Sequence, residues 1–258
     1  MRVLTLNLWG AHEPLARRLD AAAAGIAALA PDVVLLQEVR AGAEIENTAL
    51  GLARRAGGDW HTAYECSTPV RDGEEGLAIL ARAPLAGTHA IELPEARPDE
   101  RRILLSARLG EVWLHTTHLH YRLGDGLARE AQVVAASAAA RACGAGVHIF
   151  GGDFNAPPDA DEIRFLAGRT TLAGQRAVWQ DAFARVHPDE RGVTWARRNP
   201  MTDELAFLER DRRIDYIFVS PETRDGRARV LDCRVVLDEP VDGTWPSDHF
   251  AVVADVTV

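Results

Sequence analysis

The chain places polar and ionisable side chains beside apolar residues in several short segments that have the character of buried strands. A charged group in such a position needs a partner, a metal ion or a water-filled cleft. One residue of this kind is usually a satisfied structural group, but their number in one chain favours a shared site. They are Asn7, Glu38, His118, Asp153, Asn155, Asp215, Asp248 and His249.

These residue types suit the hydrolysis of a phosphoester, which needs an in-line nucleophile, relief of charge on the phosphoryl oxygens and a stabilised leaving oxygen. Mg²⁺ prefers oxygen ligands and usually keeps several waters. Glu38 is therefore the best ligand candidate, with Asn7 and Asp248 beside it. His249 can take a proton from water at neutral pH, as a general base must.

Asp153 and Asn155 flank Phe154 in the segment Gly-Gly-Asp-Phe-Asn. Side chains alternate along an extended segment, so the two polar side chains would point to the same side. One of them can orient the nucleophile while the other donates a hydrogen bond to a non-bridging phosphate oxygen.

The apolar pattern predicts strands that alternate with occasional helices. Many strands with intermittent helices favour two layers of sheet with helices packed outside. No linker, repeat or low-complexity segment interrupts the sequence, so we expect one domain over residues 1–258. The predicted strands are residues 3–8, 32–39, 59–65, 77–82, 103–109, 112–119, 147–152, 214–219, 229–237 and 250–256, and the predicted helices are residues 14–30, 43–56, 127–142 and 159–166.

Taken in order along the chain, the polar segments resemble those of the endonuclease/exonuclease/phosphatase superfamily. That family includes DNase I-like nucleases, abasic-site endonucleases, neutral sphingomyelinases, inositol polyphosphate 5-phosphatases and deadenylases. The resemblance implies an α/β fold of four layers, an α/β/β/α sandwich in which two packed mixed β-sheets are flanked by helices. It also implies a cleft at one end of the sandwich and a divalent metal, usually Mg²⁺, with Mn²⁺ as an alternative. The matching segments are TLNLW, LLQEV, EEGLAIL, THL, GGDFN, RRIDYIF and WPSDH, within residues 5–249.

The resemblance also implies roles for three further residues. Asp215 is the carboxylate expected to fix the tautomer of His249. His118 matches a second family histidine, which hydrogen-bonds the phosphate or assists the leaving group. Glu75 matches the acidic residue that holds this histidine in DNase I-like members. Some abasic-site endonucleases carry an acidic residue where this chain has Trp9, so a second metal position of that kind is not expected.

Three arginines near the segment RRIDYIF are candidates for binding the substrate, because a guanidinium group grips phosphate through two hydrogen bonds. They are Arg210, Arg212 and Arg213, which would form a basic lip over the cleft. The alternative is a solvated loop whose charges are balanced by acidic residues nearby. Trp195 could stack on a substrate or anchor the loop.

The segment His-Thr-Thr-His-Leu-His raises the alternative of a zinc site, since His118 and His120 would share one face of a strand. The Asp-His pair expected to follow in zinc hydrolases of that kind is absent, and Tyr121 and Arg122 stand there. Zinc is therefore disfavoured. Tyr121 could line the mouth of the cleft, and His115 falls on the opposite face as a structural residue.

Composition excludes several other chemistries. All 29 basic side chains are Arg, which disfavours mechanisms that need a Lys amine, such as Schiff-base catalysis, Walker-type ATP binding and protein-kinase chemistry. Three distant cysteines and the lack of an apolar leader favour a reducing cytoplasm, and no apolar run approaches the length of a membrane helix. We expect neither a stable membrane association nor a protein partner.

We therefore expect an Mg²⁺-dependent phosphoesterase. The net charge of −9 favours a small phosphorylated or lipid-derived substrate over duplex DNA, with a nuclease acting on DNA or RNA as the alternative. A catalytically silent binding module on the same fold is a hypothesis from another class. It is disfavoured because none of the motif residues is missing.

Overall fold

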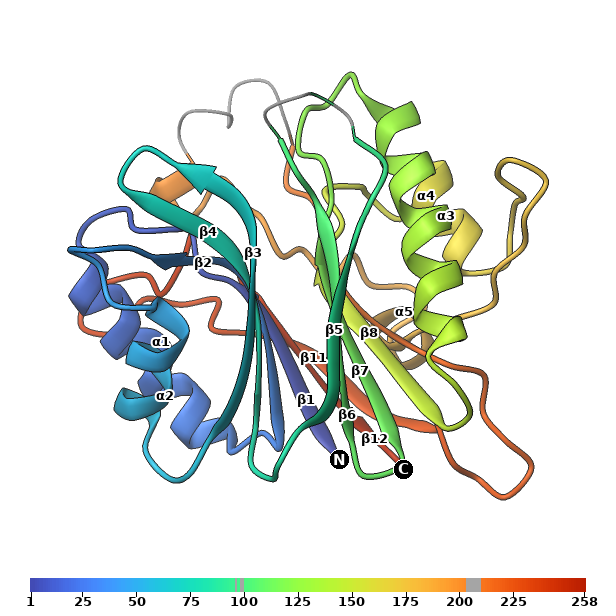
Figure 1. Cartoon of the computed structure of the whole chain (residues 1–258), viewed down its shortest axis with the longest axis horizontal. Coiled ribbons are helices and arrows are strands. Elements are labelled where there is room, and N and C mark those ends of the chain that lie inside the picture. The colour runs from blue at the N-terminus through green and yellow to red at the C-terminus, as the bar shows by residue number, and fades with distance from the viewer. Residues whose placement is uncertain (96, 98–99, 203–209) are drawn as a thin grey trace.

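Two six-stranded mixed sheets form the centre of the molecule (Figure 1). The computed structural model describes residues 1–95, 97, 100–202 and 210–258. The first sheet has the order β11–β12–β1–β2–β4–β3, formed by β11 (Val230–Val236), β12 (Ala251–Val256), β1 (Arg2–Asn7), β2 (Val33–Ala41), β4 (Gly73–Ala81) and β3 (His61–Val70). The second has the order β5–β6–β7–β8–β10–β9, formed by β5 (Ala86–Glu92), β6 (Ile103–Leu109), β7 (Val112–His118), β8 (Val147–Asp153), β10 (Asp215–Val219) and β9 (Gln180–Asp181).

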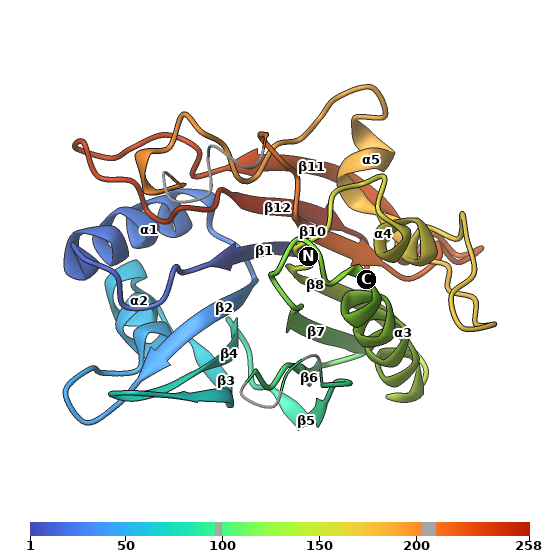
Figure 2. The ribbon, with the colours of Figure 1, turned by 90° about the horizontal axis from the view of Figure 1, so that it is seen from above.

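Helices cover the outer face of each sheet (Figure 2). The first sheet packs against α1 (Leu15–Leu29) and α2 (Thr48–Ala56), and the second against α3 (Gly126–Ala142) and α4 (Asp161–Leu166). The short α5 (Ala182–Val186) contacts β10 and β11, and a 3-10 turn covers Pro200–Thr202. The expected α/β/β/α sandwich is thus confirmed. No helix in the described part of the chain is long and apolar enough to cross a membrane.

The uninterrupted apolar residues of β2 show how the sequence specifies the layers of sheet and helix. Val33 and Leu35 enter the core between the two sheets, while Val34 and Leu36 enter the core beneath α1 and α2. Both faces of the strand are buried, so the segment is apolar without interruption instead of alternating. A third apolar layer lies between the second sheet and α3 and α4.

Most predicted elements are present, with differences at their ends. The helix predicted over residues 43–56 begins at Thr48, because the side chain of Asn47 accepts hydrogen bonds from the backbone N–H groups of Ala49 and Leu50 and so caps it. The exposed strand β5, the two-residue β9 and the five-residue α5 have no clear periodicity, and the sequence did not predict them.

A buried arginine of α1 fixes the loop that follows β1. Arg18 is fully buried, and its guanidinium group donates to the backbone carbonyls of Leu8 at 2.6 Å, Gly10 at 3.2 Å and His12 at 2.7 Å. It also lies 3.4 Å from the carbonyl oxygen of Pro246, in the loop before β12. One side chain therefore joins the loops that carry the first and last polar segments of the chain.

We expect Arg18→Met to lower the free energy of unfolding by about 3 kcal/mol or more, because buried carbonyl groups lose their donors. Arg17→Met is the matched control, since Arg17 is the exposed neighbour on the same helix. Urea unfolding of both variants measures the difference. Equal free energies of unfolding for the two variants would show that Arg18 does not hold these two loops together.

Buried histidines of the second sheet form a directed hydrogen-bond chain. His148 Nε2 lies 2.9 Å from the carbonyl oxygen of Gly144, which can only accept, so neutral His148 carries its proton there. Its Nδ1 then accepts from His115 Nε2 at 3.1 Å, and His115 Nδ1 accepts from Ser106 Oγ at 2.8 Å. Burial lowers the pKa of His115 to about 3, so His115 is neutral in the folded protein at neutral pH.

This depressed pKa links stability to pH. An unfolded histidine binds a proton below about pH 6.5, whereas folded His115 does not until near pH 3, so acid favours the unfolded chain. Between pH 7 and pH 5 we expect the free energy of unfolding to fall by about 2 kcal/mol more in the wild type than in His115→Asn. His61→Asn, at an exposed histidine, should keep the pH dependence of the wild type. A His115→Asn profile parallel to the wild-type profile would refute the assignment.

Candidate active site

The ends of five strands bring the polar segments together at one end of the sandwich. Parallel β7 and β8 place His118 opposite Asp153, and antiparallel β10 places Asp215 opposite the same Asp153. Parallel β1 and β2 place Asn7 opposite Gln37, the neighbour of Glu38. The carboxyl ends of neighbouring parallel strands meet at one sheet edge, which explains why residues distant in sequence become neighbours.

A break in the alternation of β2 turns Glu38 toward this edge. Gln37 faces the second sheet and donates to Thr116 Oγ1 at 2.9 Å, whereas Val39, two residues later, lies in the core beneath the helices. The pairing with β4 shifts register between Leu36 and Val39, and Glu38 has φ of 52°. This left-handed conformation is unfavourable for a residue other than glycine, and such strain is typical of functional positions.

Asn7 joins the two sheets at the centre of the site. Its Nδ2 donates to Glu38 Oε1 at 3.0 Å and to Asp153 Oδ2 at 3.1 Å. Its Oδ1 accepts from the backbone N–H of Trp9 at 2.9 Å. Ser247 Oγ donates to the backbone carbonyl of Asn7 at 2.7 Å, which ties the segment WPSDH to β1.

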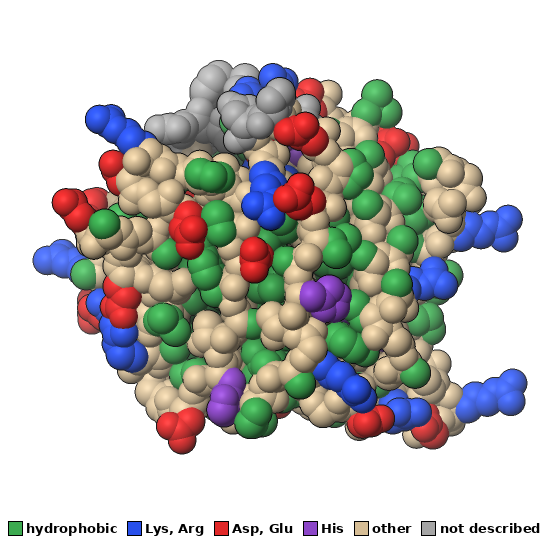
Figure 3. Space-filling model, viewed as in Figure 1, with side chains coloured by type: hydrophobic (Ala, Val, Ile, Leu, Met, Phe, Trp, Pro, Cys, Tyr) green, Lys and Arg blue, Asp and Glu red, His purple; other side chains and the backbone are tan. Residues whose placement is uncertain are grey.

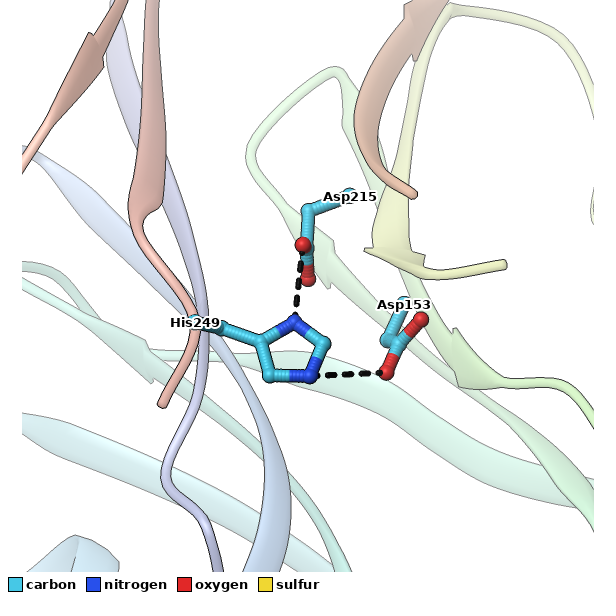
Figure 4. A group of neighbouring side chains, drawn as sticks. All are labelled: Asp153, Asp215 and His249. Carbon is cyan, nitrogen blue, oxygen red and sulfur yellow. Dashed lines mark hydrogen bonds and ion pairs between the residues drawn. The ribbon is translucent and has the colours of Figure 1, made fainter. Parts of the chain in front are cut away.

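His249 and Asp215 form a buried pair (Figure 4). His249 Nδ1 lies 2.9 Å from Asp215 Oδ2, and His249 Nε2 points to Asp153 Oδ2 at 3.7 Å. Burial opposes the charge on His249, but the carboxylates of Asp215, Asp248 and Asp153 outweigh it and raise the pKa of His249 well above its usual value. The pair has the geometry in which a carboxylate fixes a histidine tautomer and leaves the other ring nitrogen free for proton transfer.

Asp153 lies between two imidazoles. His118 Nε2 is 3.5 Å from Asp153 Oδ2, the oxygen that His249 also approaches. Burial raises the pKa of Asp153 to about 7, and burial lowers the pKa of His118 well below its usual value. Asn155, with φ of 50°, donates from its backbone N–H to Asp153 Oδ1 at 2.9 Å and from Nδ2 to the Leu119 carbonyl at 3.0 Å.

The donor set fits a divalent metal. The side chains of Glu38, Asp153 and Asp248 line one cleft, with the Asn7 amide between two of them. Burial raises the pKa of Asp248 to about 6, and the charge of Glu38 adds to this effect. Crowded, buried carboxylates of this kind favour a cation, and hard oxygen ligands suit Mg²⁺.

Single ligand atoms of Asp153, Asp215 and His249 also lie within 4.8 Å of one another. A metal there would compete with the 2.9 Å hydrogen bond between Asp215 and His249, which occupies one ligand atom of each.

Glu75 lies beside Glu38 and makes no hydrogen bond to His118, the partner expected from the resemblance, within the described chain. β4 pairs Glu75 with Arg40 of β2, and a Cβ at Gly10 would lie 3.7 Å from both Glu75 Oε2 and Glu38 Oε2. Burial raises the pKa of Glu75 to about 7, and the charge of Glu38 contributes. Glu75 thus adds to the acidic character of the cleft.

The cleft has a volume of about 320 Å³. Of the candidates for substrate contact, Tyr121, Trp195 and Arg212 line it. Tyr121 is 46% exposed, whereas Trp195 is buried and lies beneath the guanidinium group of Arg212 at 5.0 Å. The ring of Trp195 is therefore covered by Arg212 and packs within the loop, so it is not available to stack on a substrate.

Two of the three candidate arginines lie outside this lining. Arg213 is buried, donates to Asp181 Oδ1 at 2.9 Å and lies over the rings of Phe183 and Tyr216. It lines a neighbouring pocket instead of the cleft. Arg210 is exposed and does not line the cleft. Asp181 is far from Arg213 in sequence, so the sequence carried no sign of this ion pair.

Four residues that line the cleft were not predicted as site residues: Trp9, His12, Arg102 and Ile214. Trp9 and His12 stack on each other with ring centroids 4.4 Å apart at one wall, and Arg102 lies near Glu75 and His118. Arg102 directly precedes the strand predicted over residues 103–109, and that position is the one signal that could have identified it. Its neighbour Arg101 is equivalent in type but points to Glu92.

Comparisons with known proteins agree with this geometry. The Endonuclease/Exonuclease/phosphatase family model matches residues 4–249. A search of curated protein sequences finds no match. Similar solved structures include an endonuclease/exonuclease/phosphatase family protein from Leptotrichia buccalis, with 17% identity, a TM-score of 0.74 and full coverage of both chains.

Two others were determined with DNA products. The 3′ phosphatase NExo from Neisseria, bound to a product DNA hairpin, has 21% identity, a TM-score of 0.69 and full coverage of both chains. TDP2 from D. rerio, complexed with a single-strand DNA product, has 20% identity and a TM-score of 0.75, with 98% of this chain and 97% of that chain covered. At sequence identities this low, the structural similarity establishes that the fold is shared.

The family match spans nearly the whole chain, and its polar segments meet in one acidic cleft around a buried Asp–His pair. The chain belongs to the endonuclease/exonuclease/phosphatase family and is a phosphoric ester hydrolase.

Proposed function

We propose that this protein hydrolyses a phosphoester by in-line attack of water that His249 activates, with Mg²⁺ as its metal and Mn²⁺ as an alternative. The observation that carries the proposal is the buried pair of Asp215 and His249, whose free Nε2 opens on the cleft beside Asp153. The carboxylates of Asp215, Asp248 and Asp153 raise the pKa of His249, and a cation bound among the cleft carboxylates would offset part of that effect. With Nδ1–H held by Asp215, Nε2 of the neutral ring is then the atom that accepts the proton of the attacking water.

The other polar residues position the water and the phosphate. Asp153 Oδ2 can orient the attacking water, because it lies next to His249 Nε2. Asn155 uses one N–H of its amide on Leu119 and keeps the second for a non-bridging oxygen. His118, neutral because of burial, serves as a hydrogen-bond donor to the phosphate or the leaving oxygen.

Glu38, Asn7 and Asp248 would hold the metal. A bound divalent cation polarises a phosphoryl oxygen and offsets the negative charge of the reacting group. The carboxylates that line the cleft would repel a phosphate without such an ion. Glu75 extends this acidic surface.

The size and charge of the cleft support a small or lipid-derived phosphoester as the substrate. A cavity of about 320 Å³ accommodates a compact group, and Arg213 is turned away from it. Arg102 and Arg212 line the cleft among several carboxylates. The side of the molecule drawn in Figure 3 has arginines interspersed with acidic side chains and no extended basic patch. A duplex would need such a patch along its backbone.

We expect the protein to act in the cytoplasm.

A nucleic acid is the second candidate substrate. The similar structures of the Neisseria 3′ phosphatase and D. rerio TDP2 hold a DNA hairpin and a single strand as products. The end of a strand is compact enough for this cleft. Parallel assays on plasmid DNA, single strands, sphingomyelin and small mono- and diesters separate the candidates, and cleavage of DNA alone would overturn the preference for a small substrate.

We expect Asp215→Asn to lower kcat about 10²- to 10⁴-fold with Mg²⁺ present, because His249 loses the group that fixes its tautomer. His249→Gln should lose at least as much. Asp232→Asn on β11 is the control, as its carboxylate pairs with Arg234 on the surface. The assay is release of product from the best ester of the panel. Near-wild-type turnover by Asp215→Asn would contradict the mechanism, and absence of any cleavage by the wild type would favour a silent binding module.

Removal of metal should abolish the activity and lower the melting temperature, because a cation bound only to the folded state stabilises it. We expect EDTA to eliminate turnover and added Mg²⁺ to restore it. Glu38→Gln should lose the rise in melting temperature with Mg²⁺, whereas Glu65→Gln, at an exposed position of β3, should keep it. A wild-type melting temperature independent of Mg²⁺ would remove the metal from the mechanism.

A further inference from the structure

Arg102 is a positively charged side chain in the wall of the cleft. It is only 9% exposed and lines the cleft with Glu75 and His118, and its charge acts to lower the pKa of both residues. Its position is fixed at the start of β6, where its backbone carbonyl accepts from the N–H of Leu93 at 2.9 Å. The guanidinium group therefore sits in the wall of the cleft, beside the histidine that faces Asp153.

One edge of this guanidinium group is held by Glu100, and the other edge has no hydrogen-bond partner in the part of the chain that the structure describes. Arg102 Nε and Nη2 donate to Glu100 Oε1 at 2.9 Å and 2.6 Å. Nη1 makes no hydrogen bond to any described residue, and Arg102 makes none to Glu75 or another carboxylate of the cleft. Its anchor lies outside the group of carboxylates proposed to hold the metal. Arg102 is thus more than a counterion that neutralises these carboxylates.

A fully buried histidine holds the anchor in place. His120 Nδ1 is 2.7 Å from Glu100 Oε1, and His120 Nε2 is 2.8 Å from Asp125 Oδ2. Each ring nitrogen therefore lies within hydrogen-bond distance of a carboxylate oxygen. Glu100 Oε1 is thus contacted by Arg102 and His120 together.

The loop that carries His120 is itself fixed by α3. The backbone N–H of His120 donates to Gln132 Oε1 at 2.9 Å, and Arg129 Nη1 donates to the carbonyl of Arg122 at 2.6 Å. Arg129 is in turn paired with buried Glu162 at 2.8 Å. These contacts leave Glu100 and Arg102 little freedom, so the free guanidinium edge is preorganised.

Resting on the proposed phosphoesterase function, we propose that Arg102 binds non-bridging oxygens of the substrate phosphate, and that Glu100 and His120 are the positioning residues that aim it. A preorganised guanidinium group pairs with phosphate oxygens through short, charge-assisted hydrogen bonds. The ligand class is a phosphate mono- or diester, and inorganic phosphate as product is its simplest member.

Direct binding of inorganic phosphate tests this assignment. With Mg²⁺ present, we expect Arg102→Met to weaken phosphate binding at least about tenfold in isothermal titration calorimetry, and Arg102→Lys to give an intermediate value because it keeps the charge but not the fork. Arg101→Met is the matched control, since Arg101 is exposed and paired with Glu92. Its phosphate affinity should equal that of the wild type.

The positioning role has its own readout. Glu100→Gln and His120→Gln should weaken phosphate binding about threefold or more, while the rise in melting temperature with Mg²⁺ stays that of the wild type, because the metal residues are untouched. A structural role alone would lower the melting temperature without changing phosphate affinity in the folded protein.

Phosphate binding tests the role of Arg102, and ester cleavage tests the proposed function. Unchanged phosphate affinity in Arg102→Met, or no phosphate binding by the wild type, would overturn the inference. Phosphate binding that depends on Arg102, without cleavage of any ester, would support the inference and refute the proposed hydrolysis.

Discussion

A single amide nitrogen joins the two halves of the site. Asn7 Nδ2 donates to Glu38 of the first sheet and to Asp153 of the second, so the relative position of the two sheets sets the distance between these carboxylates. The apolar core between the sheets fixes that position, because close-packed interiors resist displacement. The chemistry of the cleft therefore depends on how the two sheets pack, and a small shift between them would separate the Glu38 and Asp153 carboxylates.

The same packing places charge where it is unfavourable for stability. Burial raises the pKa values of Asp153, Asp248 and Glu75 to about 6 or 7, and Glu38 and Asn155 adopt left-handed backbone conformations. Such features destabilise a fold, and they persist because the surrounding structure over-determines them. Arg18 supplies part of this support, since it holds the loop after β1 to the loop before β12. The contacts that stabilise this end of the sandwich thus surround the residues that destabilise it.

Sequence reasoning could locate the polar residues because each interrupts an apolar segment, and the strands that carry them are strongly patterned. It could not locate the turn at Glu38, which rests on a register shift against β4. It also could not separate Arg102 from Arg213. Both directly precede a strand, and only the ion pairs to Glu100 and Asp181, set by the fold, direct one toward the cleft and the other away from it. The pairing of Glu75 with Arg40, which brings Glu75 close to Glu38, has the same origin in strand register.

The proposed mechanism contains one displacement at phosphorus, by water, with no covalent intermediate. The stereochemical course of the reaction tests this most directly: hydrolysis, in water enriched with ¹⁸O, of a phosphorothioate ester that is chiral at phosphorus. In-line attack of water activated by His249 should give inversion of configuration at phosphorus. Retention would require two displacements through a phosphorylated side chain, and would contradict the assignment of His249 as the base.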